Sequence, residues 1–505
     1  MKLFYKPAYI SLAVDILTLI LSSYVVLDWF PLTTQTPFNK YSWPSFFFML
    51  IWLICSYLLK RYLPLRRERY FKATFKLFYT SLIVFGFFWA LIFFFFNGFF
   101  SEFVLFSITI SAFSLEYVFL FLFFAYRYAV QYDGPISQKE ERPKTLVKPA
   151  SRLDESSYND LCITISKYSG VQVLTFLSNT IDLESGNTLV SVTSDTINLK
   201  LRPNFLFSTI VNLEILNNSN GINSMFSVIN EKLPDDGLFI CCYESKSTRK
   251  KRILKRYFKG LNYFFYTIDF FIKRILPKIF ITRRLYFDLT HGKNRILSKA
   301  EVLGRLYSCG FEVLKEKKIG QLTYVYAQRV KQPICIKNPS YGPLIRLRRF
   351  GEDGKPFNVY KMRTMHPYSE YLQAYIYLRN NLKDGGKFNK DIRITTIGKL
   401  MRKYWLDELP MVINLLKRNM KLVGVRPLSE HYFSLYSKEL QEKRIKFKPG
   451  LFPPFYADLP RTLDEIQASE MRYLMACETN GVFITDFHYF FRIMKNILIK
   501  KVRSA

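Results

Sequence analysis

Cysteine and histidine are scarce in this sequence, and their spacing excludes several classes of site. The seven cysteines in 505 residues include no CxxC pair, and the four histidines have no spacing typical of a zinc site. The cysteines also lack the framework of a disulfide-stapled secreted domain, which indicates a reducing compartment. We therefore expect the histidines in ordinary core or surface positions. Only His366 stands out among them, because it directly follows the motif KMRTM.

Acidic residues are few relative to basic ones. The chain has 40 Asp and Glu against 73 Lys and Arg, a net charge of +33. No recognised nucleic-acid module accompanies this charge, and the basic residues gather beside hydrophobic segments and C-terminal motifs. The pattern excludes nucleic acid as the expected partner and favours an anionic membrane surface and phosphate-bearing substrates.

Hydrophobic and aromatic residues are abundant, at 49% and 17% of the chain. Four long apolar windows occupy about 8–27, 44–62, 77–97 and 103–126, each near the length of a bilayer crossing. No small-residue processing site follows the first window, so a cleaved signal peptide fits poorly. The sequence predicts an integral membrane protein with a four-helix transmembrane domain over residues 1–132.

Basic residues in the loops predict the orientation of these spans. Six of them lie between the second and third windows: Lys60, Arg61, Arg66, Arg67, Arg69 and Lys72. This loop is expected in the cytoplasm, and four spans then return the chain to the cytoplasm. Two acids inside windows, Asp15 and Glu116, are expected either to pair with polar groups or to line a functional path, and a structural role is favoured.

A polar, charged segment over 133–157 predicts a linker, and residues 158–332 predict an α/β domain. The runs LCITIS, VQVLTFL, FSTIVNLEIL and GLFICCYE have the composition of buried strands, and INSMFSVINEKLPDDG that of a helix and turn. Ser298 is a plausible cap for a further helix, followed by two strands. EKLPDDGLFI and this last part resemble the back half of class I S-adenosylmethionine-dependent methyltransferases. A convincing glycine-rich turn is missing, so we interpret the domain as a degenerate Rossmann-like module without methylation activity.

Within this domain, residues near 261–285 have a different character. The segment LNYFFYTIDFFIKRILPKIFITRR follows a basic run and combines aromatic residues, Pro277 and flanking cations. This composition predicts an interfacial or re-entrant segment at a membrane surface. An amphipathic helix packed on the middle domain is the alternative.

Asp407 and Glu408 form the most informative pair in the chain. They lie in WLDELPMVINLLKRNMKLVGVRP, with basic residues on both sides. In this setting one carboxylate could attack phosphorus while its neighbour holds a metal ion. A lone acidic pair more often complements a helix dipole, so the interpretation depends on the surrounding motifs.

Those motifs follow one another over residues 338–500: NPSYGPLIRLRRFGEDGKPFNVYKMRTM, DIRITTIGKLMRKYWLDELP, LVGVRP and FKPG. Together they resemble the bacterial sugar transferase family, the polyprenyl-phosphate sugar phosphotransferases that start capsule, exopolysaccharide or O-antigen synthesis. The resemblance implies a mainly helical α/β catalytic domain over residues 333–505. It also implies that Asp407 is the nucleophile, that Glu408 is a metal ligand, and that the cofactor is Mg²⁺.

The resemblance further implies a substrate site, partners and a location. Its expected residues are Lys361, Arg363, Arg402, Arg426 and Asp486. The implied partners are a nucleotide diphosphosugar, polyprenyl (undecaprenyl) phosphate and the lipid bilayer, with the catalytic domain on the cytoplasmic side of the bacterial inner membrane. The sequence leaves the sugar and the formation of a homo-oligomer open.

Several departures from the family pattern keep a second function open. The family's long hydrophobic helix ahead of the GP motif is replaced by the short, polar TYVYAQRVKQPICIKNPSYGP, and GPRP is replaced by GVRP. These changes allow a catalytically silent membrane scaffold or regulator of polysaccharide assembly. A methyltransferase is a third and poorer reading.

Overall fold

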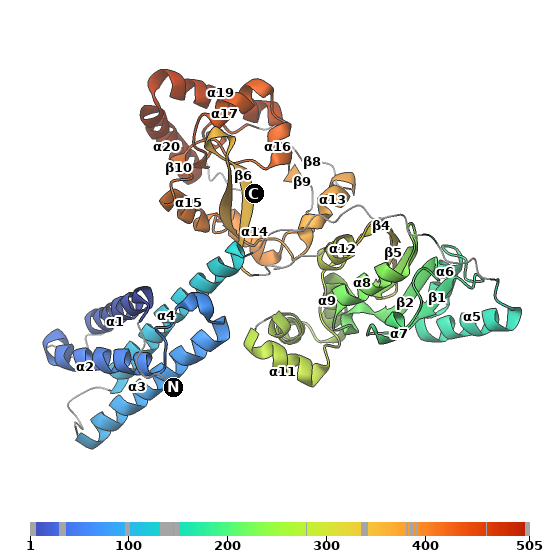
Figure 1. Cartoon of the computed structure of the whole chain (residues 1–505), viewed down its shortest axis with the longest axis horizontal. Helices are drawn as coiled ribbons and strands as arrows, with labels where there is room; N and C mark the ends of the chain where they lie inside the picture. Colours follow the sequence, from blue (N-terminus) through green and yellow to red (C-terminus); the bar gives the residue numbers. More distant parts are fainter. Residues whose placement is uncertain are drawn as a thin grey trace. The chain divides into compact units, whose positions relative to one another are not determined.

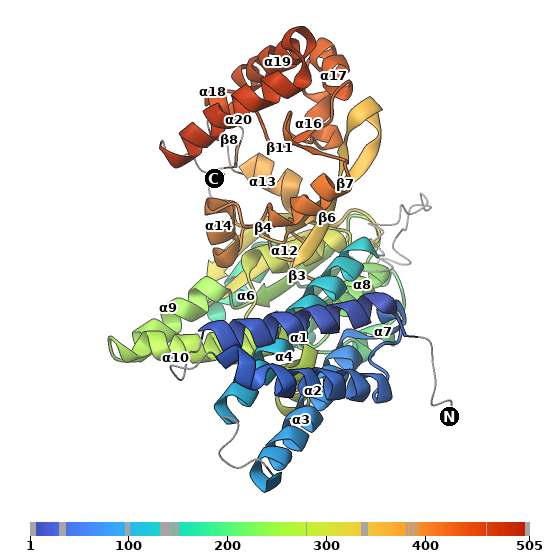
Figure 2. The ribbon, with the colours of Figure 1, turned by 90° about the vertical axis from the view of Figure 1, so that its left-hand side faces the viewer.

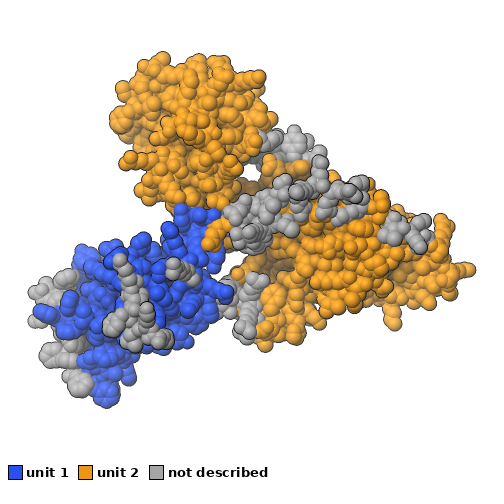
Figure 3. Space-filling model, in the orientation of Figure 1, with its two compact units in different colours: residues 1–130 blue, residues 131–505 orange. Residues whose placement is uncertain are grey.

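The chain divides into two compact units, residues 1–130 and 131–505, which are coloured separately in Figure 3. The computed structural model describes residues 7–29, 37–95, 102–131, 145, 151–278, 280–334, 342–379, 382–383, 387–388, 391–460 and 462–499. Most of the predicted linker over 133–157 lies outside the described residues, and its last three residues begin a helix.

Four apolar helices make up the first unit (Figure 1). They are α1 (Tyr9–Trp29), α2 (Pro37–Leu58), α3 (Tyr70–Phe95) and α4 (Glu102–Val130). By length and composition α1, α3 and α4 are long and apolar enough to cross a membrane, whereas the described apolar part of α2, Trp43–Leu58, is shorter. The predicted apolar windows are therefore helices, although the second ends at Leu58 rather than residue 62 and the third begins at Tyr70 rather than residue 77.

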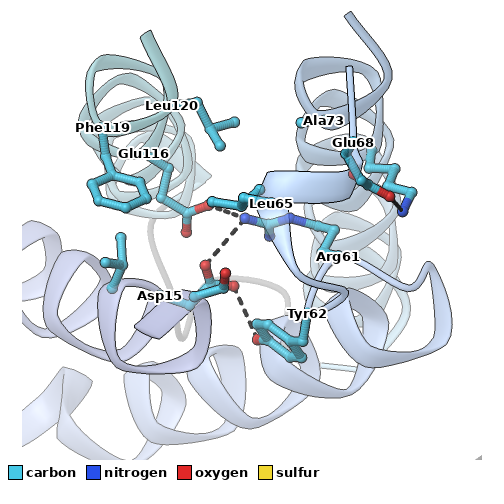
Figure 4. A pocket seen from close by; sticks show the side chains of 12 residues that line it. Asp15, Arg61, Tyr62, Leu65, Glu68, Ala73, Glu116, Phe119 and Leu120 are labelled. Atoms are coloured by element: carbon cyan, nitrogen blue, oxygen red, sulfur yellow. Dashed lines mark hydrogen bonds and ion pairs between the residues drawn. The ribbon is translucent and has the colours of Figure 1, made fainter. Parts of the chain in front are cut away.

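A buried ion cluster joins three parts of this unit (Figure 4). Asp15 of α1 and Glu116 of α4 are 3% and 1% exposed, and both pair with Arg61 from the turn after α2. Tyr62 and Ser56 also donate hydrogen bonds to Asp15 Oδ2, at 2.9 and 3.1 Å. The prediction that the two acids pair with polar groups is confirmed, because burying them unpaired would be costly.

The second unit begins with a five-stranded mixed sheet in the order β1-β2-β3-β5-β4. Its strands are β1 (Thr188–Ser191), β2 (Thr209–Ile215), β3 (Leu238–Tyr243), β4 (Phe311–Ile319) and β5 (Leu322–Arg329). β1, β2 and β3 are parallel, whereas β5 is antiparallel to both of its neighbours. The strands predicted from FSTIVNLEIL and GLFICCYE are β2 and β3. The predicted helix before β3 is α8 (Ile222–Lys232), and Ser298 caps α12 (Lys299–Ser308) as predicted.

Two of the predicted strands are helices, so that part of the prediction was wrong. LCITIS lies in α5 (Glu155–Ser169) and VQVLTFL in α6 (Val171–Ser178). Asp154 caps α5 by accepting a hydrogen bond from Ser157 N, and Gly170 turns the chain between the helices at φ 90°. A short apolar run does not distinguish a strand from a buried helix. Here the Asp154 cap favours the helix.

Helices cover both faces of the sheet because side chains alternate along each strand. On β3, Phe239, Cys241 and Tyr243 face a core shared with α8 and α12, whereas Ile240 and Cys242 face a second core shared with α5 and α6. Between β3 and α12 the chain forms α9 (Lys246–Arg256), α10 (Leu261–Phe270) and α11 (Phe280–Thr290). This middle region is α/β, as predicted.

The C-terminal part is mainly helical and contains small two-stranded sheets. An antiparallel hairpin, β6 (Leu344–Phe350) and β7 (Pro356–Met362), precedes α13 (Gln373–Arg379) and α14 (Thr396–Lys403). A parallel pair, β10 (Lys421–Val423) and β11 (Gly450–Phe452), lies in a core with the long helices α19 (Leu463–Asn480) and α20 (Val482–Leu498). The shorter elements are α7 (Ile197–Lys200), β8 (Leu382–Lys383), β9 (Lys387–Phe388), α15 (Val412–Leu416), α16 (Glu430–Ser434), α17 (Lys438–Ile445) and α18 (Phe455–Asp458).

Candidate active site

Asp407 and Glu408 lie in a turn after α14, just ahead of the short helix formed by Leu409–Met411. Two features fix this turn. Trp405 adopts a left-handed conformation, with φ 55°, and its ring packs edge-on against Tyr456. The carbonyl of Asp407 accepts a hydrogen bond of 2.8 Å from Met362 N at the end of β7. A backbone hydrogen bond therefore joins the acidic pair to β7, whose last two residues, Lys361 and Met362, begin the KMRTM motif.

Glu408 forms an ion pair with two predicted substrate-site residues. Lys361 Nζ donates to Glu408 Oε1 at 2.7 Å, and Arg426 Nη2 lies 3.7 Å from the same oxygen. Burial lowers the pKa of Lys361, and Arg426 lowers it further, while Glu408 opposes the shift. The structure brings Glu408, Lys361 and Arg426 together from three motifs that are separated by up to 65 residues of sequence.

Asp407 is buried, at 7% exposure, and its Oδ1 has no hydrogen-bond partner among the described residues. Burial raises the pKa of this carboxyl, and the adjacent Glu408 charge raises it further, while Lys361 and Arg402 pull it down. An unpartnered buried oxygen is costly in a folded protein and is a frequent feature of functional sites.

Arg402 and Arg363 are each held by a side-chain hydrogen bond near the end of β7. Arg402 Nε donates to Thr364 Oγ1 at 3.1 Å, and Arg363 Nε donates to the carbonyl of Gly342 at 3.0 Å, in the GP motif. Helix α14 approaches closely because Gly398 has no side chain: a Cβ there would lie 2.0 Å from the Thr364 carbonyl oxygen. Arg402 is close enough to Asp407 to affect its pKa. Arg363 is instead held by the GP segment.

The GVRP and KPG motifs meet beside the parallel strands β10 and β11. Gly450 N donates to the Val425 carbonyl at 2.9 Å, and a Cβ on Gly450 would lie 2.1 Å from Gly424 N. The carbonyl of Arg426 accepts a hydrogen bond from the buried Arg444. This close backbone approach holds Arg426 in place, and it leaves no room for a side chain on Gly424 or Gly450.

Asp486, on α20, makes contacts of a structural kind. Lys421 Nζ donates to both of its carboxylate oxygens at 3.0 Å, and the Tyr473 hydroxyl also donates to it. Its hydrogen bonds among the described residues join α20 to β10 and α19 and do not reach Asp407 or Glu408. The predicted substrate-binding role of Asp486 stays a prediction.

Asn414 is a site-supporting residue that the sequence reasoning missed. It is fully buried on α15, accepts a hydrogen bond from Tyr360 N at 3.1 Å and donates to the Asn358 carbonyl at 2.7 Å. These bonds join the segment after DELP to the strand that carries Lys361. The only available signal was an Asn among apolar residues, in MVINLL.

The donor set at the acidic pair is suited to a magnesium ion. The described residues contain no group of three or more His, Cys, Asp or Glu side chains placed to hold a metal. Mg²⁺ is usually bound by one or two carboxylates, with water and substrate phosphates completing its shell. The unpartnered oxygen of Asp407 beside Glu408 is consistent with such a site.

Comparison with known proteins agrees with the motifs. The C-terminal part of the chain, residues 324–500, matches the family model described as bacterial sugar transferase. It is similar to a galactosyl transferase, CpsE, of Streptococcus agalactiae, at 38% identity over 22% of this chain and 25% of that protein. It is also similar to a UDP-glucose:undecaprenyl-phosphate glucose-1-phosphate transferase of Caulobacter vibrioides, at 35% identity over 23% of this chain and 42% of that protein.

A further relative is a UDP-N-acetylgalactosamine-undecaprenyl-phosphate N-acetylgalactosaminephosphotransferase of Aeromonas hydrophila, which is 33% identical over 21% of this chain and 23% of its own length. The matched region spans less than half the length of these relatives. The family match begins at residue 324, so the methyltransferase-like character of the middle region stays a prediction.

Proposed function

We propose that this protein transfers a phosphosugar from a uridine diphosphosugar to undecaprenyl phosphate, the first step of a capsule, exopolysaccharide or O-antigen pathway. The observation that carries the proposal is the buried, unpartnered Asp407 oxygen beside a Glu408–Lys361–Arg426 ion pair, within a bacterial sugar transferase domain. The names of the relatives support the choice of a UDP-linked sugar and undecaprenyl phosphate.

In the first half-reaction, an Asp407 carboxylate oxygen attacks the sugar-linked phosphorus. The new bond joins that oxygen to phosphorus, the bond from this phosphorus to the bridging oxygen of the diphosphate breaks, and uridine monophosphate leaves with that oxygen. In the second half-reaction, an oxygen of undecaprenyl phosphate attacks the phospho-aspartate and releases the Asp407 carboxylate. Lys361, Arg402 and Arg426 neutralise the diphosphate, and Arg363, held by the GP segment, serves as a further cation.

Glu408, with Asp407 beside it, would hold Mg²⁺, which stabilises negative charge on the phosphate oxygens when it is bound. Lys361 and Arg426, which pair with Glu408, would turn to the substrate phosphates. Asp486 is proposed to act through Lys421 and β10, ahead of Arg426.

The protein is proposed to lie in the bacterial cytoplasmic membrane, with residues 1–132 spanning the bilayer and the catalytic domain facing the cytoplasm. Nucleotide sugars are present on that side. The basic residues in the loop before α3 favour a cytoplasmic location for that loop, which agrees with this orientation. A catalytically silent scaffold is the second candidate function, favoured only by the altered GVRP and the replaced helix before the GP motif.

Capture of the phospho-enzyme separates these two functions. The purified full chain is incubated with UDP-sugars labelled in the phosphate next to the sugar, without undecaprenyl phosphate. Label retained on the protein and released by undecaprenyl phosphate supports transfer. If wild-type protein retains no label from any UDP-sugar that it binds, the scaffold function is the correct one.

Asp407→Asn is expected to abolish retention, about a thousandfold or more, because the amide cannot form the intermediate. Glu408→Gln should weaken loading and be partly restored by raised Mg²⁺, since only a metal ligand is altered. Asp353→Asn and Glu439→Gln are matched controls, because both residues are exposed and lie outside the site. Normal loading by Asp407→Asn would remove Asp407 from the nucleophile role.

A further inference from the structure

Helix α10 has its apolar side chains on the outside. In most helices of a folded domain, residues that recur every three or four positions form the buried face. Here the residues with that spacing along α10 and the turn after it are exposed by 39–59%. They are Leu261, Phe264, Phe265, Ile268, Phe271 and Ile272.

The opposite face of α10 is polar and fixes the helix in this orientation. Asn262, only 8% exposed, donates to the Leu254 carbonyl at 3.1 Å. Asp269 accepts two hydrogen bonds of 2.7 Å from the buried Arg249 of α9. The helix cannot roll its apolar face inward without breaking these buried polar contacts, which is costly. The outward face is therefore a built feature of the domain.

Basic residues lie beside this apolar face, on α9 and just before α10. Four exposed cations lie on α9 and in the turn before α10: Lys251, Lys255, Arg256 and Lys259. Arg256 lies 5.9 Å over the ring of Tyr257, which stacks on Phe265 at 4.3 Å, so this charge lies next to the apolar face. Helices α9 and α10 lie side by side (Figure 2), so the basic and aromatic side chains belong to one surface. We call it the α9–α10 surface.

We propose that the α9–α10 surface docks on the headgroup region of a membrane containing anionic phospholipids. Exposed aromatics with a rim of Lys and Arg suit that region, because the rings enter the acyl boundary while the cations meet phosphate. A second copy of this chain is a poorer partner, because a symmetric contact would bring the same basic rims together in a protein of charge +33.

Docking would also bear on the proposed function, on which this part of the inference rests. The segment after α10 carries the buried Arg274, whose guanidinium donates to Glu301 Oε2 at 2.5 Å and lies 3.5 Å from His366 Nδ1. His366 follows Arg363 by three residues. The surface is thus connected through Arg274 to the segment that follows β7. It supplies a membrane contact in a chain that lacks the family's hydrophobic helix before the GP motif.

Photocrosslinking in the full chain tests the docking directly. Phe264 is replaced by benzoylphenylalanine, and the protein is reconstituted into vesicles that carry radiolabelled phospholipid. Val171, 66% exposed in the same middle region, is the matched control position. We expect at least fivefold more lipid adduct at 264 than at 171 in vesicles with about one-third anionic lipid, and markedly less in zwitterionic vesicles. Equal adducts at both positions, or adducts at 264 with another copy of the chain or an acidic protein, would overturn the proposal.

Charge reversal supplies a second readout. Lys251→Glu, Lys255→Glu and Lys259→Glu together should lower the lipid adduct at 264 severalfold and slow transfer to undecaprenyl phosphate. Phosphosugar loading on Asp407 should be unchanged, because the UDP-sugar is soluble. An unchanged adduct would reject lipid docking. A chain that forms lipid adducts but never loads phosphosugar would reject the proposed function while leaving the docking intact.

Discussion

Asn414 shows how much of the site depends on a residue that touches no substrate. Its amide bridges Tyr360 N and the Asn358 carbonyl, so α15 and β7 keep a fixed distance. Lys361 follows Tyr360 on that strand and pairs with Glu408, which lies just ahead of α15. The buried amide of Asn414 therefore helps to position Lys361 against Glu408.

Asn414→Ala should weaken both stability and loading. Two buried backbone groups would lose their partner, at a cost of about 2–3 kcal/mol, and the shifted acidic turn would slow loading about tenfold. Thermal unfolding and the rate of label retention are the measurements. Asn480→Ala, at an exposed end of α19, is the control. Unchanged unfolding and loading would show that Asn414 does not position the site.

We predict that protonation of His366 destabilises the fold in acid. This side chain lies beside Arg274 of the middle region, in the segment that follows β7. Burial and the nearby Arg274 lower the pKa of His366 to about 4, against an ordinary value of 6.5. The folded chain therefore binds this proton less tightly than the unfolded chain. The resulting loss of stability sets in as pH falls below about 6.5 and is complete near 4, reaching about 2 kcal/mol at pH 5.

The measurement is the shift of the unfolding midpoint between pH 7 and pH 5. His366→Gln should shift less than the wild type, because its side chain does not titrate, whereas His488→Gln, at an exposed position of α20, should shift as the wild type does. Equal shifts in all three proteins would mean that His366 gains its proton freely in the folded state.

At the scale of elements, the apolar helices of the first unit are joined by charge as well as by apolar packing. Asp15 and Glu116 belong to α1 and α4, and the single guanidinium of Arg61 pairs with both. Thr18 adds a hydrogen bond of 3.3 Å to Glu116 Oε1. The cluster therefore fixes the relative position of α1, α4 and the turn after α2.

Arg61→Met should destabilise this unit by about 3–5 kcal/mol, because it leaves two buried carboxylates without a cation. Combining it with Asp15→Asn and Glu116→Gln should recover most of that loss, since no buried charge remains. The unfolding midpoint of detergent-purified protein measures both effects, and Arg66→Met, at an exposed position, is the control. A triple variant no more stable than Arg61→Met would argue that the ion pairs themselves hold the helices.

The elements also show where sequence reasoning succeeded. β2 and β3 were predictable because their apolar runs are bounded by turns, and the long apolar helices were predictable from length alone. Residues 161–166 and 171–177 were mistaken for strands because a short apolar run has no distinct period. The acidic pair was recognised from motif order, whereas Asn414, the Trp405 turn and the Arg61 cluster depend on contacts between distant segments, which no local pattern encodes.

At the scale of the whole molecule, each hydrophobic core formed by the described residues belongs to one unit. The cores of the sheet and of the C-terminal helices draw their buried residues from the second unit, and the membrane-helix core draws its own from residues 19–124. A unit with its own core can fold alone. The middle and C-terminal parts are less separable, because Leu372, Tyr375 and Ile376 complete a core of the sheet.

A chain limited to residues 131–505 should therefore fold and load phosphosugar within about threefold of the full-length rate, because the proposed first half-reaction uses only residues of this unit. It should sediment with anionic vesicles and not with zwitterionic ones, whereas the same chain with Lys251, Lys255 and Lys259 changed to Glu should stay in solution.

Cutting instead between the middle and C-terminal parts should yield aggregated protein, because the sheet loses Leu372, Tyr375 and Ile376. Label retention, sedimentation and unfolding measure these outcomes. A soluble 131–505 chain that unfolds cooperatively but retains no label would mean that the membrane helices help to form the catalytic site.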